Sequence, residues 1–341
     1  MQAPPFAPDV ELYKKLSIVA NPRPAIRKLP SVRTGKTSHH LPSQPQLQLD
    51  SPAIKAHIES EFLTDYLDDF SKFFILIATP RSSHISSLTH QAVRGRRVVI
   101  TEDPGLHLVW YRDRVFLKPV PKYLLSYAFW AFYLHHPDSP LSPEVRDAVG
   151  RAARGFLRSY AYLIQHPSDF LAAQESQHRL IPKGVSYKEF KLFICTCLEN
   201  ITDDDVSPRY HYGELRLSRL NLWSQVLLRR FAYHKVASDY GTLFAEYFAS
   251  LLFIFAGFSV VLSAMQVAIT AQPILGLGGL WVKLVQVSLW FSVVVIHITA
   301  AAVLFLLLKF IALGLREVIF ATKTSWKKER RRRKASAKEQ P

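Results

Sequence analysis

Two long apolar runs near the end of the sequence constrain its fold more than any other feature. The first covers Tyr247 to Thr270 and contains no charged residue. The second covers Leu284 to Leu308, where His297 is the only ionisable residue. An α-helix needs about 20 apolar residues to cross the hydrocarbon core of a bilayer. Both runs meet this requirement, so the sequence predicts a transmembrane hairpin of two helices within residues 240–322.

The charged residues around these runs indicate an orientation in the membrane. The chain has 43 Lys and Arg against 27 Asp and Glu, a formal net charge of +16. Arg229 and Arg230 precede the first run, and a strongly basic segment, residues 323–341, follows the second. Because basic segments stay on the cytosolic side, we expect both termini in the cytosol, in the endoplasmic reticulum or another endomembrane. We expect the basic tail to bind anionic headgroups of the lipid bilayer, and we expect no nucleic-acid partner.

The sequence before the apolar runs divides into two parts. Residues 1–50 are rich in proline and polar side chains, a composition typical of disorder, and lack the apolar core of a signal peptide. Residues 51–239 are enough for one cytosolic domain with a hydrophobic core. Cys195 and Cys197 are the only cysteines. They predict reduced thiols in a cytosolic helix, because two cysteines cannot form the disulfide framework of a small secreted domain.

Hydrophobic periodicity predicts the elements of residues 51–239. Apolar spacing and start signals indicate four main helices. Short β-branched and aromatic runs, separated by turn-forming residues, predict a small antiparallel β-meander. The expected fold class is α+β, mostly α: a cytosolic helical domain with a small antiparallel β-meander, followed by a C-terminal two-helix transmembrane hairpin. The expected helices cover 52–70, 142–164, 186–201 and 212–233, and the expected strands lie in 98–100, 106–111 and 115–117.

One further uncharged run, Tyr123 to Leu134, is too short to span a bilayer. It is rich in Tyr, Phe and Trp, so it predicts either a helix buried in the domain or one that lies at the membrane interface.

The densest group of polar residues lies between Glu199 and Asn221. The adjacent carboxylates at 203–205 could bind Mg²⁺ together with a phosphorylated substrate, or one of them, kept protonated by its neighbours, could act as a general acid. Alternatively, these acids belong to a loop that caps a helix and balances nearby arginines. No cofactor motif and no dedicated metal site is indicated. The candidate catalytic residues are Asp203, Asp204, Asp205 and Glu214, and the candidate substrate-binding residues are Tyr210, Tyr212, Arg216, Arg219 and Asn221.

Sequence signatures of the common enzyme classes are missing from the chain. It has no G-x-S-x-G, H-E-x-x-H, P-loop, G-x-G-x-x-G or paired C-x-x-C sequence. The glycines at 276–279 lie between the two apolar runs instead of between a strand and a helix, so they do not predict a phosphate-binding loop. The sequence therefore leaves open whether the protein is an enzyme.

Three stretches carry a resemblance to a known group of proteins. They are VVITEDPGLHLVWYRDRVFLKPVPKYLLSYAFWAFYL (98–134), RLIPKGVSYKEFKLFI (179–194) and VSPRYHYGELRLSRLN (206–221). The sequence over about residues 50–320 resembles an uncharacterised family of filamentous-fungal membrane proteins, which are often labelled automatically as subtilisin-like serine proteases. The resemblance implies a fold outline and a fungal source but no established activity. The residues themselves give the protease label no support.

The predicted architecture is also similar to that of CorA-type magnesium channels, in which a cytosolic α/β domain precedes two C-terminal spans. Those channels carry a Gly-Met-Asn signature at the end of the first span. This sequence reads Ile269-Thr270-Ala271-Gln272-Pro273 at the corresponding place, so only a degenerate relative would fit.

Three hypotheses about function follow from these observations. The first is a membrane-anchored accessory or scaffold protein that has protein partners or forms a homo-oligomer, in a fungal membrane that serves a secondary-metabolite pathway. The second is a membrane-bound enzyme on a lipid or isoprenoid substrate, which would use the acids at 203–205 and the aromatic run at 123–134 as a terpene cyclase does. The third is a degenerate CorA-like ion transporter.

Overall fold

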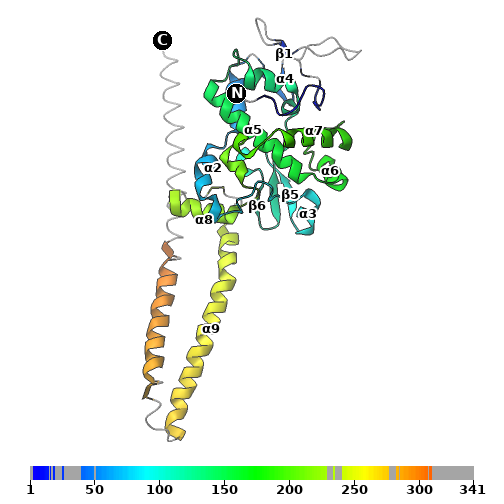
Figure 1. The fold of residues 1–341 in the computed structure, drawn as a ribbon. Coiled ribbons are helices and arrows are strands. Elements are labelled where there is room, and N and C mark those ends of the chain that lie inside the picture. Colours follow the sequence, from blue (N-terminus) through cyan, green and yellow to red (C-terminus); the bar gives the residue numbers. More distant parts are fainter. Residues whose placement is uncertain are drawn as a thin grey trace, which may run out of the picture. The chain divides into compact units, whose positions relative to one another are not determined.

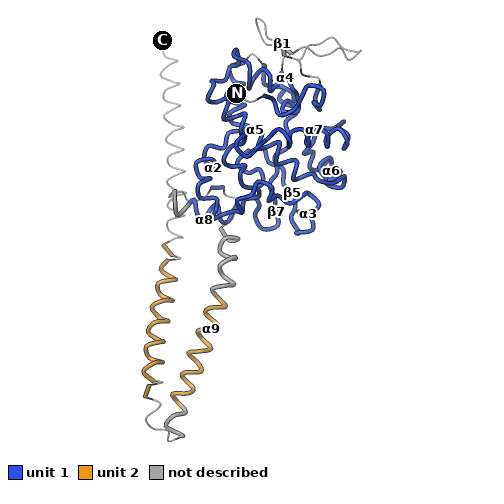
Figure 2. The backbone as a smooth tube through the Cα atoms, in the orientation of Figure 1, with its two compact units in different colours: residues 1–235 blue, residues 236–341 orange. Residues whose placement is uncertain are grey.

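The computed structural model describes residues 3–14, 16, 18–19, 25–26, 40–49, 51–228, 233–234, 240–275, 282–283, 285–305 and 307–308. The chain forms two compact units, Met1–Lys235 and Val236–Pro341, which Figure 2 shows in blue and orange. The predicted basic tail at 323–341 and the glycines at 276–279 lie outside the described residues, as does much of the segment expected to be disordered.

The expected fold class is confirmed, because unit 1 is mostly helical and carries a small four-stranded sheet beside two two-stranded pairs, β1-β2 and β3-β4 (Figure 1). Its α-helices are α1 (Ala53–Phe62), α2 (Asp65–Phe70), α3 (Leu88–Val93), α4 (Tyr127–Phe129), α5 (Pro143–Leu163), α6 (Pro167–Gln174), α7 (Tyr187–Glu199) and α8 (Leu217–Leu228). The strands are β1 (Ile18–Val19), β2 (Ala25–Ile26), β3 (His40–Leu41), β4 (Gln44–Gln48), β5 (Arg97–Ile100), β6 (Val109–Tyr111), β7 (Arg114–Leu117) and β8 (Leu215–Arg216). Shorter helical turns are η1 (Ser71–Leu76), η2 (Pro104–Leu106), η3 (Lys122–Leu125), η4 (Trp130–His135), η5 (Asp203–Asp205) and η6 (Pro208–His211).

Helix α5 is the central element of unit 1, and its bounds agree with the prediction of a helix at 142–164. Proline is favourable in the first turn of a helix, where its missing N–H would have no partner, and Pro143 takes this place. One long stretch of α5 is buried, and it packs against α1, α7 and η4. A Cβ atom at Gly155 would overlap the ring of Tyr210. The small residues of α5 therefore allow the segment around η6 to approach the helix closely.

The sheet has the strand order β5-β7-β6-β8. Strands β6 and β7 form the antiparallel hairpin that the sequence predicts. Strand β5 differs from a simple meander because it pairs in parallel with β7. The link from β5 to β6, residues 101–108, contains the helical turn η2 and Leu108, whose φ of 60° is left-handed. This link is too long for a hairpin turn, so it places β6 on the far side of β7.

Two predicted helices end or begin elsewhere than expected. The helix expected over 52–70 is broken at Leu63, which adopts an extended conformation between α1 and α2. The helix expected over 212–233 begins only at Leu217, so Glu214 does not lie on this helix as the prediction requires. The reason is tertiary pairing: the backbone N–H groups of Glu214 and Leu215 donate to the carbonyls of His84 and Leu108, at 3.1 and 2.9 Å. The chain therefore joins the sheet as β8 before α8 starts.

The aromatic run at 123–134 is a buried part of unit 1, so the first of the two predicted alternatives is confirmed. It folds as η3, α4 and η4, in which Tyr123, Phe129, Trp130 and Tyr133 are almost completely buried. The Trp130 ring N–H donates to the carbonyl of Leu124 at 2.9 Å. These rings fill the core, and they do not line the wall of an open pocket.

The described N-terminal residues 3–14 pack against this aromatic run. Phe6 is 2% exposed, and its ring centroid lies 4.7 Å from that of Phe193 in α7. The Glu11 carboxylate accepts the backbone N–H of Tyr127 at 2.8 Å, and the backbone N–H of Leu12 donates to the carbonyl of Leu125. This part of the proline-rich segment thus contributes to the core of unit 1, while the division of the chain at residues 50 and 51 stays a prediction.

Unit 2 contains α9 (Tyr240–Leu275) and a second apolar helix (Figure 1). Two stretches, Leu252–Thr270 and Val285–Phe305, are long and apolar enough to cross a membrane. They lie within the two predicted runs. Phe258 and Phe291 pack against each other, with ring centroids 6.3 Å apart.

Candidate functional site

The three adjacent aspartates point to different partners. Asp203 is mostly exposed and forms an ion pair with Arg158 of α5 at 2.7 Å. Asp205 is buried, and its carboxylate accepts the backbone N–H and the hydroxyl of Thr202, at 2.9 and 2.7 Å. Asp204 is exposed to solvent. In this arrangement Asp205 caps the turn η5, as acidic residues do at the start of helical turns. The structure therefore does not gather the three carboxylates around one point.

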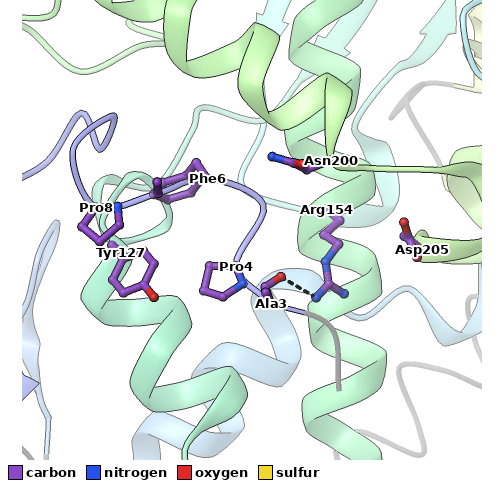
Figure 3. Close-up of a pocket in the computed structure, with 9 residues that line it drawn as sticks. Ala3, Pro4, Phe6, Pro8, Tyr127, Arg154, Asn200 and Asp205 are labelled. Atoms are coloured by element: carbon purple, nitrogen blue, oxygen red, sulfur yellow. Dashed lines mark hydrogen bonds between the residues drawn. The ribbon is translucent and has the colours of Figure 1, made fainter.

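Asp205 lines a hollow of about 470 Å³. Figure 3 shows this hollow between the N-terminal segment and α5. Arg154 donates to the carbonyl of Ala3 at 3.5 Å and lies near Asp205 (Figure 3). Burial lowers the pKa of the Arg154 guanidinium, although Asp205 opposes this effect. Phe6, Tyr127 and Asn200 complete the polar and apolar sides of the hollow.

Glu214 belongs to a different hydrogen-bond network. One carboxylate oxygen accepts from the backbone N–H of Ser86 and the amide of Gln91, at 2.7 and 2.6 Å. The other oxygen pairs with Arg96 at 2.7 Å. The Glu214 side chain is 4% exposed, so its charge is compensated by partners inside the protein. The carboxylate connects the segment before α3 to β8, and both of its oxygens are engaged in this structural role.

The candidate substrate-binding residues lie apart from one another. Tyr210 is buried beside Gly155, and the Tyr212 ring packs edge-on against Phe74, with centroids 5.3 Å apart. Arg216 stacks on Trp110, and Arg219 donates to the carbonyl of Ile77 at 3.3 Å.

Asn221 completes this group of candidate residues. It accepts the backbone N–H groups of Tyr233 and His234, at 2.8 and 3.2 Å. Asn221 therefore holds the backbone of these two residues, and the Tyr233 hydroxyl also donates to the carbonyl of Gly105.

The most buried polar cluster of unit 1 was not among the predicted residues. Arg209 is 1% exposed, and its guanidinium donates to the carbonyls of Tyr212, Gly213 and His107, at 3.0 to 3.1 Å. Lys118 is 1% exposed and lies 3.0 Å from the carboxylate of Glu61. In the sequence, Lys118 stands next to the predicted strand at 115–117, and nothing in its spacing indicates that it is buried.

His107 connects this cluster to α5. Its Nδ1 accepts the backbone N–H of Lys118 at 3.2 Å, so Nε2 carries the proton and donates to Ser159 Oγ at 2.9 Å. Burial, with the nearby charges of Arg209 and Lys118, holds the pKa of His107 well below its usual value. The imidazole is therefore neutral near pH 7.

The His107–Ser159 pair does not have the chemistry of an activated nucleophile. A general base must accept the proton of the serine hydroxyl, whereas here His107 donates and the hydroxyl donates in turn to the carbonyl of Phe156 at 2.6 Å. Ser159 is 3% exposed, and His107 is 1% exposed. The cluster thus acts as an internal network that joins the sheet to α5.

Metal binding finds no support in the described part of the chain. Within the described residues, no group of three or more His, Cys, Asp and Glu side chains is placed to hold a metal ion. Cys195 and Cys197 are free thiols, and burial raises the pKa of Cys197. The Mg²⁺ reading of the three aspartates therefore has no geometric basis.

The comparison with known proteins agrees with an uncharacterised family. The model of a family described as "Family of unknown function (DUF6601)" matches residues 54–299. The match includes nearly all of the helical part of unit 1 and most of both apolar helices. No curated protein and no solved structure matches the chain.

Proposed function

We propose that this chain, which belongs to the family of unknown function DUF6601, is a membrane-anchored accessory or scaffold protein. In this proposal the two apolar helices anchor unit 1 at an endomembrane, with both termini in the cytosol. The resemblance to fungal membrane proteins supports the proposal that this membrane is fungal. We propose that the protein serves a secondary-metabolite pathway there. Its partners would be the bilayer and other proteins, including further copies of this chain.

The observation that carries the proposal is the exposed apolar surface of unit 2. Phe253, Val260 and Trp290 are 81, 69 and 67% exposed. Water-exposed apolar surface of this extent is unfavourable, at about 25 cal/mol per Å², whereas the hydrocarbon core of a bilayer would cover it. The absence of charged residues from both predicted runs fits the same environment.

The internal bonding of unit 1 supports an accessory role over a catalytic one. Glu214 and Asp205 are buried and bound to backbone N–H and side-chain groups, and Asp203 is paired with Arg158. Catalytic acids are usually left in clefts where a substrate can reach them. Here the candidate acids stabilise turns and strand ends.

Deletion and complementation test the proposal. The lipid and metabolite profile of a deletion strain of the source organism would be measured after complementation with three forms of the chain. We expect the full chain and an Asp203→Asn/Asp204→Asn variant to restore the profile, because these exposed acids have no catalytic task. We expect a chain truncated after residue 239 to fail, because it lacks the anchor.

The opposite pattern would overturn the proposal. If the double Asn variant reaches the membrane in normal amounts yet fails to restore the profile, the acids have a chemical task. Restoration by the truncated chain would show that the anchor is dispensable. The Asp204→Asn single change is the matched control, since Asp204 lies exposed in the same turn.

A membrane-bound enzyme on a lipid or isoprenoid substrate is the second candidate. The hollow between the N-terminal segment and α5 favours it, because Arg154 and Asp205 line this hollow. An Asp205→Asn variant that retains normal thermal unfolding but changes the profile would support it. A degenerate CorA-like transporter would instead form a closed ring in detergent, and a monomer by mass photometry would exclude that reading.

A further inference from the structure

One end of the four-stranded sheet gathers arginines and aromatic rings. The register places Arg97 of β5 opposite Arg114 of β7, and Arg114 opposite Tyr111 of β6. On the next pair of strands, Trp110 lies opposite Arg216. Directly opposed residues on neighbouring strands point to the same face of a sheet, whereas successive residues of one strand point to opposite faces. Arg97, Arg114 and Tyr111 therefore lie on one face of this end of the sheet, and Trp110 and Arg216 lie on the other. We call the residues that surround this end on both faces the arginine patch, and it consists of Arg97, Trp110, Tyr111, Arg112, Arg114 and Arg216.

The arginine patch has an excess of positive charge. Arg97, Arg114 and Arg216 carry three positive charges, and Asp113 at the hairpin tip carries one negative charge, which leaves a formal charge of 3 − 1 = +2 for these four residues. Asp113 pairs with Arg97 at 2.5 Å and lies 3.8 Å from Arg114. Among the described residues, Arg216 forms no ion pair, and its side chain is exposed. Asp113 therefore cannot neutralise Arg97, Arg114 and Arg216 together.

Stacking on aromatic rings fixes two of these guanidinium groups. Arg216 lies 5.0 Å from the ring centre of Trp110, and Arg112 lies 5.3 Å from that of Tyr111. A third arginine, Arg96, stacks on Trp110 at 4.0 Å and is held by Glu214. A stacked guanidinium can still donate hydrogen bonds from its edge. The half-buried Trp110 ring is thus held in a cationic setting at the surface.

This chemistry fits the headgroup layer of an anionic bilayer. Guanidinium groups bind phosphate in a bidentate manner, and Trp and Tyr side chains are enriched at membrane–water interfaces. The connectivity of the chain adds a constraint, because Arg216 directly precedes α8 and Leu252, the start of the first apolar stretch, follows only 36 positions later. A tether of this length gives the patch a high effective concentration at the membrane surface.

We propose that the arginine patch is a docking surface for anionic lipid headgroups of the bilayer in which the two apolar helices lie. The proposal rests on the membrane location given above. It adds a second contact between unit 1 and the membrane, so that unit 1 lies against the surface when anionic lipid is present. Each arginine near an anionic surface raises the affinity by about fivefold.

Hydrogen–deuterium exchange of the full chain in nanodiscs tests this proposal. One set of nanodiscs contains phosphatidylcholine alone, and the other also contains phosphatidylserine. We expect slower exchange in peptides that cover residues 109–116 in the second set, and we expect raised salt to reverse the effect. An Arg114→Gln/Arg216→Gln variant should lose this difference, with a roughly 25-fold lower affinity of the patch for the anionic surface.

A matched variant controls for net charge. Lys183 and Lys188 are exposed in unit 1 outside the patch, and a Lys183→Gln/Lys188→Gln variant should keep the lipid-dependent protection. If the full chain enters nanodiscs but exchanges equally in both lipids, the docking surface is refuted while the membrane location stands. Failure to enter nanodiscs at all would refute the membrane location itself. Protection by added polyuridine, with none by phosphatidylserine, would assign the patch to a soluble polyanion and overturn the proposal.

Discussion

Arg209, Lys118 and His107 have little contact with water, and their polar atoms are bonded inside unit 1. A buried charge is costly unless hydrogen bonds or an opposite charge compensate for it. Arg209 meets this need with three backbone carbonyls, and Lys118 meets it with Glu61 and the carbonyl of Glu102. His107 avoids the cost by staying neutral. At the scale of single residues, the polar interior of unit 1 therefore serves stability.

The neutral state of His107 predicts how stability depends on pH. The pKa of His107 is lowered in the folded protein, whereas an unfolded histidine has a pKa of about 6.5. Below this value the unfolded chain binds a proton that the folded protein does not, so the free energy of unfolding falls as the pH decreases. One such group contributes a slope of up to about 1.4 kcal/mol per pH unit. Thermal unfolding of the full chain in detergent between pH 7 and pH 5 measures it.

A His107→Gln variant provides the comparison for this prediction. Its amide can still donate to Ser159, and it does not titrate. We expect the variant to be less stable at pH 7 and to lose part of the pH dependence between pH 6.5 and pH 5. Equal slopes for the variant and the natural chain would contradict the assignment of a neutral buried imidazole.

At the scale of elements, the contact between β8 and the segment before α3 determines that α8 starts only after residue 216. The backbone of Gly213 lies so close to the His84 carbonyl that a Cβ atom would overlap it. Glu214 and Leu215 then bond to His84 and Leu108. Glycine is therefore required at position 213 by close approach of two backbones.

A Gly213→Ala variant should destabilise unit 1. Overpacking of this kind costs about 1–3 kcal/mol, because neither backbone can move without breaking the β8 contacts. Urea titration of the full chain in detergent, followed by tryptophan fluorescence, measures the loss. Gly150→Ala is the control, since its Cβ would meet only the Arg154 side chain at 3.5 Å. That change should be neutral or stabilising by about 0.5–1 kcal/mol, and a larger loss for Gly150→Ala than for Gly213→Ala would contradict the argument.

The same contact shows where prediction from sequence reaches its limit. Local signals were sufficient for α5, where Pro143 occupies the first turn, and for α7, where the Ser186 side chain caps the helix. Long-range pairing decided the regions that were predicted wrongly. Residue 214 has helical spacing in the sequence, yet its carboxylate turns inward to Arg96, which lies more than a hundred positions earlier.

The prediction of the candidate site from sequence was limited by the same kind of long-range contact. The run of three aspartates was visible in the sequence, but its partners Arg158 and Thr202 decide that Asp203 and Asp205 have separate structural tasks. The buried cluster of His107, Lys118 and Arg209 has no sequence motif, since these residues meet only through the fold. Whether any candidate residue takes part in catalysis stays a prediction.

At the scale of the whole molecule, the two units have opposite surfaces. Unit 1 buries the aromatic rings of the run at 123–134 in its core, whereas unit 2 exposes Phe253, Val260, Trp290 and Val294 on its two helices. Exposed apolar residues that cover whole helices indicate a membrane environment. The match to DUF6601 continues from unit 1 into the second apolar helix, so both surfaces belong to one family architecture.

Charges placed on the apolar helices should therefore prevent stable membrane insertion. An arginine at the centre of a membrane helix costs about 2.5–3.5 kcal/mol on the scale derived from insertion experiments. We expect a Val260→Arg/Val294→Arg variant, with one change in each helix, to leave the membrane pellet after an alkaline carbonate wash. The natural chain should remain in the pellet. Quantitative immunoblotting of pellet and supernatant measures the two fractions.

Exposed leucines of unit 1 provide the matched control for this experiment. Leu171 and Leu192 are 67 and 61% exposed, much as Val260 is, but they lie on α6 and α7. Arginine at both positions adds the same charge to the chain, and because these side chains face water in unit 1, the Leu171→Arg/Leu192→Arg variant should stay in the pellet. If both variants are extracted equally, the loss reflects misfolding. If the Val260→Arg/Val294→Arg variant resists extraction like the natural chain, the exposed apolar faces of unit 2 do not contact lipid, and the membrane anchor is refuted.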